Sequence, residues 1–170
     1  MGMGRSFQLT QLCPDFTAIE NVLLSLEATH GGSPDIFRNP RRNALNVKTS
    51  KVWLERVGLG ADENRVVSTL AHGQRRQLEI AVALARSPRV ILFDEPMAGM
   101  GPEESASLTE LLKSLKRDYT ILLIEHDMDA VFALADRISV LVYGKIIFTG
   151  TASEVRVHPD VKAAYLGGNG

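Results

Sequence analysis

The sequence has 170 residues, of which 45% are hydrophobic and 23% are charged. This length and composition are typical of a folded globular chain with a sizeable core, and they exclude an intrinsically disordered protein. The 19 basic and 20 acidic residues nearly balance, which excludes a nucleic-acid binder that works through bulk positive charge. The single cysteine, Cys13, excludes an internal disulfide and a cysteine-rich zinc module.

No apolar stretch approaches the roughly 18 to 20 residues that cross a bilayer, so membrane contact is expected only through a partner.

The first third of the chain predicts two helices. Thr17 and Glu20 have the spacing of a capping box, and apolar residues at helical spacing follow them. Residues 31–46 are rich in Gly, Pro, Arg and Asn and predict a loop. A moderately amphipathic helix is predicted over residues 47–57.

Strands and helices alternate in the remainder of the chain. The predicted helices cover residues 74–86 and 103–117 and begin again near 128, and the predicted strands cover 90–93, 120–124, 138–142 and 146–149. This alternation of apolar strands with amphipathic helices predicts an α/β fold. The first three strands are expected to be parallel and covered on both faces.

Three polar residues follow two of these strands, namely Asp94, Glu95 and His126. In parallel sheets, ligands bind beyond the carboxyl ends of the strands, where these residues are expected to lie. Adjacent carboxylates suit a hard cation and the activation of water by a general base. A neutral imidazole could bond a phosphate or the attacking water. The alternatives are a solvated acidic turn and an exposed histidine next to a helix capped by Asp127.

Residues 70–74 (LAHGQ) precede the helix predicted at 74–86. Small residues at a helix N-terminus leave backbone N–H groups open, and the helix dipole favours an anion there. An ordinary helix cap made by Ser68 or Thr69 together with the glycine is the alternative.

Taken together, four segments resemble the second half of an ATP-binding cassette (ABC) ATPase. They are residues 70–88 (LAHGQRRQLEIAVALARSP), 90–96 (VILFDEP), 97–104 (MAGMGPEE) and 120–128 (TILLIEHDM). In this resemblance they contain the signature motif, Walker B, the D-loop and the switch histidine. Residues 4–8 (GRSFQ) are similar to the stretch that leads into the Q-loop. The order and spacing of five elements make the match specific.

The resemblance implies a role for each matched residue. Glu95 would be the catalytic base, and His126 would steady the γ-phosphate. Asp94 and Gln8 would hold or sense Mg²⁺. Contacts to ATP across a dimer would come from signature and D-loop residues, which are Ala71, His72, Gly73, Gln74 and Gly99.

The implied fold is that of P-loop NTPases, with a parallel sheet core and a helical subdomain. Residues 1–68 would contain the Q-loop and the helical subdomain, and residues 69–150 the signature, Walker B, D-loop and switch histidine. Residues 151–170 would be the tail of the same domain.

The residues of the signature motif, of the D-loop and of segment 140–167 resemble those of importers of branched-chain amino acids. Urea importers have similar residues there. The expected function is therefore the ATP-binding subunit of such an importer, with ATP and Mg²⁺ as cofactors. The expected partners are transmembrane permease subunits and a second ATP-binding subunit, with no nucleic acid. The expected location is the cytoplasmic face of the inner or plasma membrane, peripheral through the permease.

The sequence departs from the family because it contains no P-loop motif, G-x-x-x-x-G-K-[ST]. In the family that motif precedes the position of Gln8, so the chain is expected to be a cassette without its first third, inactive alone and with uncovered apolar faces. Ala71 and Gly101 replace a usual Ser and a usual Asp or Asn, which weakens contacts across a dimer. Whether the chain is itself an enzyme stays open. A non-catalytic cassette partner and a soluble ABC ATPase are the alternatives.

Overall fold

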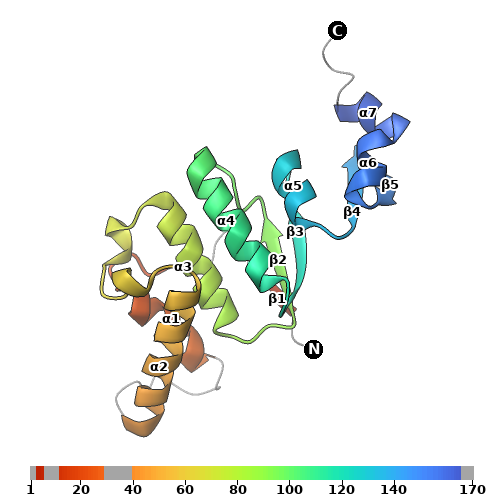
Figure 1. The fold of residues 1–170 in the computed structure, drawn as a ribbon. Coiled ribbons are helices and arrows are strands. Elements are labelled where there is room, and N and C mark those ends of the chain that lie inside the picture. The colour runs from red at the N-terminus through yellow and green to blue at the C-terminus, as the bar shows by residue number, and fades with distance from the viewer. Residues whose placement is uncertain (1–2, 6–11, 29–39, 166–170) are drawn as a thin grey trace. The chain divides into compact units, whose positions relative to one another are not determined.

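The computed structural model describes residues 3–5, 12–28 and 40–165. Figure 1 shows their elements in chain order: β1 (Met3–Arg5), α1 (Ala18–Ala28), α2 (Pro40–Arg56), the short 3₁₀ turns Gly60–Asp62 and Val67–Thr69, α3 (His72–Leu84), β2 (Val90–Asp94), α4 (Pro102–Leu115), β3 (Thr120–Ile124), α5 (Met128–Leu134), β4 (Ile138–Val142), β5 (Lys145–Gly150), α6 (Ala152–Val157) and α7 (Pro159–Tyr165). They form two compact units, Met1–Ile124 and Glu125–Gly170.

Helix α1 begins at the predicted capping box. The Glu20 carboxylate accepts hydrogen bonds from the Thr17 backbone N–H and hydroxyl, both at 2.7 Å, and the Glu20 N–H reaches the Thr17 hydroxyl at 3.4 Å. These bonds satisfy N–H groups that have no acceptor within the helix. Val22 and Leu26, one helical turn apart, then pack into the core. The sequence-based prediction is confirmed here.

Helix α2 begins at Pro40, seven residues before the predicted start. The loop predicted over residues 31–46 is therefore wrong for residues 40–46, while residues 31–39 lie outside the described residues. Proline is favoured in the first helical turn, where its fixed φ suits the helix and its missing N–H costs nothing. We misread Pro40 and the arginines and asparagines after it as loop composition, although they belong to a helix.

Replacing Thr17 by Ala should lower the free energy of unfolding by about 1 kcal/mol at pH 7, because a helix cap is lost. Hydrogen bonds from the Thr17 backbone and hydroxyl hold the pKa of Glu20 below its ordinary value of 4.5. Their stabilisation is present above that value and is lost as the pH falls through the lower folded pKa. Urea unfolding should therefore show a smaller difference in the free energy of unfolding between the native chain and Thr17→Ala at pH 3 than at pH 7. Thr17→Ser, which keeps the hydroxyl, is the control.

Helix α3 joins the helical part of the first unit to its sheet. It packs against α1 and α2, and the Ser25 hydroxyl of α1 donates to the Val82 carbonyl at 2.8 Å in a buried position. The predicted core positions of this helix are buried: Leu78, Ala81, Val82 and Ala85. The helix begins and ends two residues before the predicted bounds.

The sheet of the first unit has the order β1-β2-β3 within the described residues, and its neighbouring strands are parallel. Figure 1 shows α3 and α4 beside this sheet. Alternate residues of β2, Ile91 and Phe93, are only 1% and 2% exposed. Leu108, Leu112 and Leu115 of α4 are equally buried. The predicted parallel α/β core is therefore confirmed.

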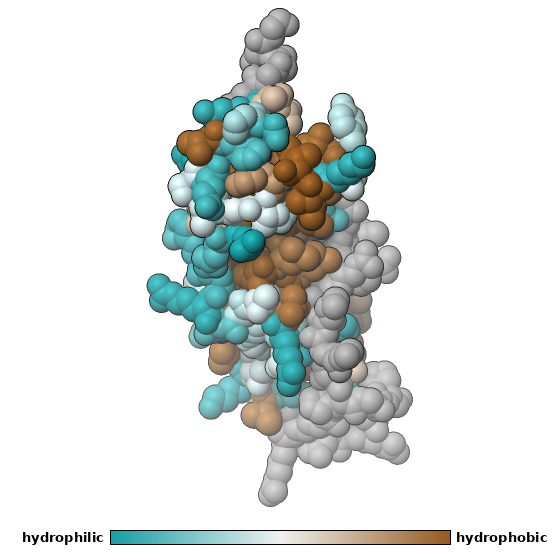
Figure 2. Space-filling model, turned by 90° about the vertical axis from the view of Figure 1, so that its right-hand side faces the viewer, coloured by the Kyte–Doolittle hydropathy of each residue, from teal (hydrophilic) through white to brown (hydrophobic). Residues whose placement is uncertain are grey.

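One face of β3 is open. Its residues Leu122 and Ile124 are 58% and 49% exposed, while Ile121 and Leu123, which alternate with them, are partly buried. Figure 2 shows hydrophobic residues exposed at the surface. The expectation that this strand is covered on both faces is wrong, and the expectation of uncovered apolar surface is confirmed.

The second unit is built on an antiparallel pair, β4 and β5. The prediction that strand 138–142 continues the parallel sheet is therefore wrong. The two strands are joined at Tyr143 and Gly144, whose φ values of 47° and 77° are those of a tight hairpin turn. Ile138, Val140, Val155 and Val161 form the buried core of this unit. The short Tyr-Gly turn decides the pairing, because two residues cannot connect parallel strands.

No helix in the described part of the chain combines the length and the apolar character needed to cross a membrane.

Candidate functional site

The acidic pair lies at the carboxyl end of β2, as predicted. Asp94 is the last residue of the strand and pairs with Ile124, the last residue of β3. The next residue, Glu95, donates its backbone N–H to the Ile124 carbonyl at 2.8 Å. Asp94 is half-buried and Glu95 is exposed. The two carboxylates therefore stand at the edge of the sheet where α/β proteins bind ligands.

The backbone of Glu95 is strained, since its φ of 46° lies in the left-handed region that favours glycine. Such a conformation costs of order 1 to 3 kcal/mol for a residue with a side chain and persists only where its surroundings hold it. Strain of this kind is concentrated at functional sites. The sequence analysis identified the residue but could not show that its backbone is strained.

Replacing Glu95 by Gly should make the chain more stable than replacing it by Ala, by about 0.5 to 1 kcal/mol in the free energy of unfolding. The glycine adopts the positive φ without a steric cost, and this gain exceeds the entropy that it loses on folding. Denaturant unfolding of the two variants measures the difference directly. Equal stability of the two variants would mean that the turn is not strained.

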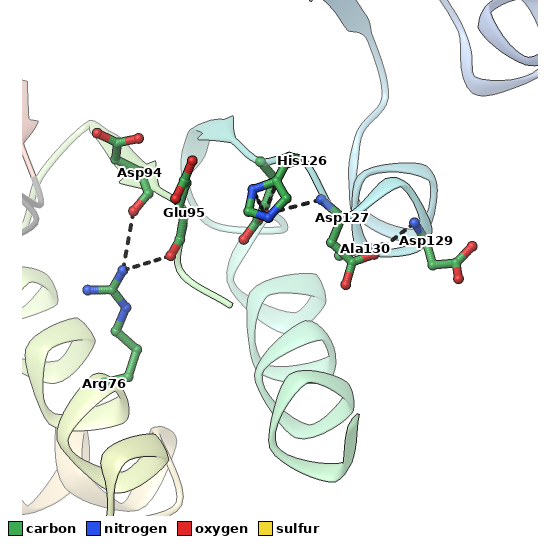
Figure 3. A network of polar contacts seen from close by, with 8 residues as sticks. Arg76, Asp94, Glu95, His126, Asp127, Asp129 and Ala130 are labelled. Carbon is green, nitrogen blue, oxygen red and sulfur yellow. Dashed lines mark hydrogen bonds and ion pairs between the residues drawn. The ribbon is translucent and has the colours of Figure 1, made fainter. Parts of the chain in front are cut away.

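Arg76 of α3 contacts this turn and was missed by the sequence analysis. Its guanidinium donates to the backbone carbonyls of Asp94, Glu95 and Pro96, at 3.3 Å in each case. Figure 3 shows Arg76 pointing at the first two of these carbonyls. It also forms an ion pair with Glu79 at 2.7 Å, and both of these side chains are mostly buried. An arginine within a helix gives no sequence signal for contacts of this kind.

The predicted signature residues surround the N-terminus of α3. The Ala71 N–H donates to the Gln74 side-chain oxygen at 3.1 Å, and the other end of that amide donates to Asp62 at 2.9 Å. Ala71 caps the helix without a side-chain bond. The alternative of a cap made by Ser68 or Thr69 is wrong, because the residue that caps the helix is Ala71, and the Thr69 hydroxyl bonds the Val66 carbonyl. The first N–H groups of α3 have no acceptor within the helix and can bind an anion.

The D-loop and α4 lie against this helix terminus. The His72 ring nitrogen Nε2 is 3.4 Å from the Ala98 carbonyl, and Gly99 beside it has a φ of 76°. A Cβ at Gly73 would lie 2.8 Å from the Glu104 Oε1 atom, closer than real contacts allow. The Glu104 carboxylate of α4 therefore lies directly against Gly73 of α3. The first unit thus brings the predicted signature, Walker B and D-loop residues together.

His126 lies in the second unit. Its backbone N–H donates to the Glu125 carboxylate at 3.0 Å, its ring nitrogen Nδ1 is 3.7 Å from that carboxylate, and its side chain is 73% exposed. Asp127 caps α5 by accepting from the N–H groups of Asp129 and Ala130, as predicted (Figure 3). Gln8 lies outside the described residues.

The described residues fit a nucleotide-bound divalent cation better than a cation held by protein alone. No group of three or more His, Cys, Asp or Glu side chains able to hold a metal occurs among them. Asp94 and Glu95 provide two neighbouring carboxylates. Mg²⁺ is commonly bound by one or two carboxylates with phosphates and waters, and this donor set fits that pattern.

Known proteins with similar sequences belong to the family that this arrangement indicates. Residues 2–98 match the family model described as ABC transporter, and residues 145–170 match the model described as branched-chain amino acid ATP-binding cassette transporter. The high-affinity branched-chain amino acid transport ATP-binding protein LivG of Salmonella typhimurium is 40% identical over 174 residues, which cover 98% of this chain and 68% of LivG.

Solved structures agree with the sequence matches. The crystal structure of the ADP conformation of an ATP-binding cassette of an ABC transporter superposes on this chain with a TM-score of 0.78 and 30% sequence identity. The match covers 98% of this chain and 68% of that one. A dimeric post-hydrolysis state of another cassette, bound to ADP and Pi, has a TM-score of 0.70 and 27% identity, covering 89% and 63%.

The chain therefore belongs to the ATP-binding subunits of ABC transporters, and its fold is that of their P-loop NTPase cassettes. Membership of this family implies that nucleotide is its ligand. The resemblance drawn from the signature, Walker B and D-loop segments is confirmed at the level of the family.

Proposed function

We propose that the chain provides the signature, Walker B and D-loop parts of an ATP-hydrolysing site in an importer of branched-chain amino acids. The observation that carries the proposal is the convergence of these parts in one unit. Arg76 of α3 contacts the turn that carries Glu95, and His72 of α3 contacts the D-loop. The name of LivG and the match of residues 145–170 support the substrate class.

Each site residue has a proposed role. Asp94 would hold Mg²⁺ and Gln8 would sense it, and the bound metal would offset charge on the phosphates. Glu95 accepts a proton from the attacking water, and His126 bonds the γ-phosphate.

A second set of residues acts across the dimer. Two parts of the chain contact the nucleotide held by the second ATP-binding subunit. They are the N-terminus of α3, with Ala71, His72, Gly73 and Gln74, and Gly99 of the D-loop. The absence of a hydroxyl at Ala71 removes one hydrogen bond to that phosphate, and backbone N–H groups remain.

The proposed partners are a second ATP-binding subunit and transmembrane permease subunits, and the chain is peripheral at the cytoplasmic face of the membrane through the permease. The similar dimeric cassette bound to ADP and Pi supports the first partner. The helical region within residues 1–68 contacts the permease. Residues 69–150 supply the site, and residues 151–170 are its tail.

A second candidate is a non-catalytic cassette whose partner supplies the phosphate cradle. The observation that favours it is the absence of a G-x-x-x-x-G-K-[ST] motif from the 170 residues. In both candidates the cradle is provided by polypeptide beyond these residues, and they differ in whether Glu95 acts on a nucleotide held in its own subunit.

Transport into proteoliposomes tests the proposed substrate. The chain is assembled with its permease and second ATP-binding subunit, and ATP-dependent uptake of labelled leucine is compared with that of labelled urea. Leucine uptake that requires the chain supports the proposal. Uptake of urea alone would assign the chain to the related importer, and an active assembly that needs no permease would favour a soluble ATPase.

A further inference from the structure

Arg76 connects the helix that carries the signature residues to the turn that carries Glu95. It lies one helical turn after His72, and its side chain is 17% exposed. Its donors reach three consecutive carbonyls, those of residues 94, 95 and 96. An arginine suits this task because its planar fork holds several donors in a fixed arrangement. The ion pair with Glu79, one turn further along α3, also holds the guanidinium.

The turn itself is held from two directions. The Glu95 N–H is bound to the Ile124 carbonyl at 2.8 Å on the side of the sheet, and the Glu95 carbonyl accepts from Arg76 and from the Ala98 N–H at 3.1 Å. With its φ at 46°, Glu95 keeps this conformation only while these bonds hold it. The direction of its carboxylate follows from that backbone conformation.

We propose that Arg76 is a positioning residue that locks the Glu95 turn to the signature helix. This inference rests on the proposed function of Glu95 as the base. Through Arg76 the N-terminus of α3 and the carboxylate of Glu95 keep a fixed separation. A displacement of the signature residues therefore moves the base, and the base is correctly placed only when the signature helix is in position.

Hydrogen exchange of backbone amides tests the lock on the 170-residue chain without any need for hydrolysis. In Arg76→Gln, the Glu95 and Ala98 amides should exchange about three to tenfold faster, the range expected for lost hydrogen bonds. Arg76→Lys should restore part of the protection, because an ammonium reaches fewer of the three carbonyls.

Arg75→Gln is the matched control. Arg75 is the preceding residue of the same helix and also donates to backbone carbonyls, but to those of Leu70 at 3.0 Å and Ser68 at 3.1 Å. It should leave exchange at Glu95 and Ala98 unchanged. Equal exchange at these amides in the Arg76→Gln variant and the native chain would overturn the proposal. The proposal would also be overturned if exchange at Glu95 and Ala98 accelerated no more than exchange at the core amides of Ile91 and Phe93, since that would reflect global destabilisation.

Turnover gives a second readout. In a hydrolysing assembly, Arg76→Gln should lower kcat about tenfold at unchanged KM for ATP, because it displaces the base without removing a nucleotide contact. A raised KM with unchanged kcat would overturn the positioning role. Turnover that survives Glu95→Gln would instead remove the proposed function of Glu95, while the exchange experiment still reports on the lock.

Discussion

Replacing Glu95 by Gln in a hydrolysing assembly that contains this chain lowers ATP turnover by about 10² to 10⁴-fold, the range that general-base catalysis provides. The amide has nearly the shape of the carboxylate but cannot accept a proton from water. ATP binding persists, because Glu95 is exposed at the turn and the proposed nucleotide contacts belong to other residues. Steady-state phosphate release and nucleotide retention measure the two effects together.

Glu103→Gln provides the control for that experiment. Glu103 is an exposed acid in the first turn of α4 and its removal changes the net charge of the chain equally. It should leave turnover close to that of the native assembly. Turnover retained by Glu95→Gln would exclude Glu95 as the base, and the half-buried Asp94 would then be the remaining carboxylate at the end of β2.

The 170-residue chain alone should bind ATP no tighter than about 1 mM, which corresponds to roughly 4 kcal/mol. A triphosphate bound tightly by a cassette needs a glycine-rich cradle of backbone N–H groups and a lysine, and the sequence contains no such motif. The N-terminus of α3 provides a few N–H groups, which suffice for a weak anion site.

Isothermal titration calorimetry of the pure chain with ATP and Mg²⁺ checks this expectation. Heat that saturates at micromolar ATP would show that the chain holds a complete nucleotide site of its own. The Arg76→Gln variant should bind ATP as weakly as the native chain, because the arginine contacts the backbone of the turn.

The strands and the acidic turn could be predicted from the sequence because their signals are local. The apolar run at residues 90–93 ends at Asp94, the last residue of β2, and the run at 120–124 coincides with β3. The capping box at Thr17 needs only two residues three apart. The signature segment could be placed before a helix for the same reason. What failed depended on pairing and composition, as at β4, where the alternation of strands and helices favoured the parallel sheet although the short Tyr143-Gly144 turn pairs β4 with β5.

The contacts that organise the site lay beyond sequence reasoning. Arg76 and the carbonyls that it binds are 18 to 20 residues apart. The positive φ of Glu95 has no signal either, since positions of that kind are usually occupied by glycine. Likewise, the proximity of Glu104 to Gly73 becomes visible only once α3 and α4 are seen in contact.

The measurement that tests the central claim most directly is the steady-state ATPase rate of the chain alone and mixed with a separate polypeptide that carries a G-x-x-x-x-G-K-[ST] motif. The account predicts no hydrolysis by either polypeptide alone, and hydrolysis by the mixture that Glu95→Gln abolishes. Hydrolysis that survives Glu95→Gln would contradict it, as would an inactive mixture in which the two polypeptides demonstrably bind each other and ATP.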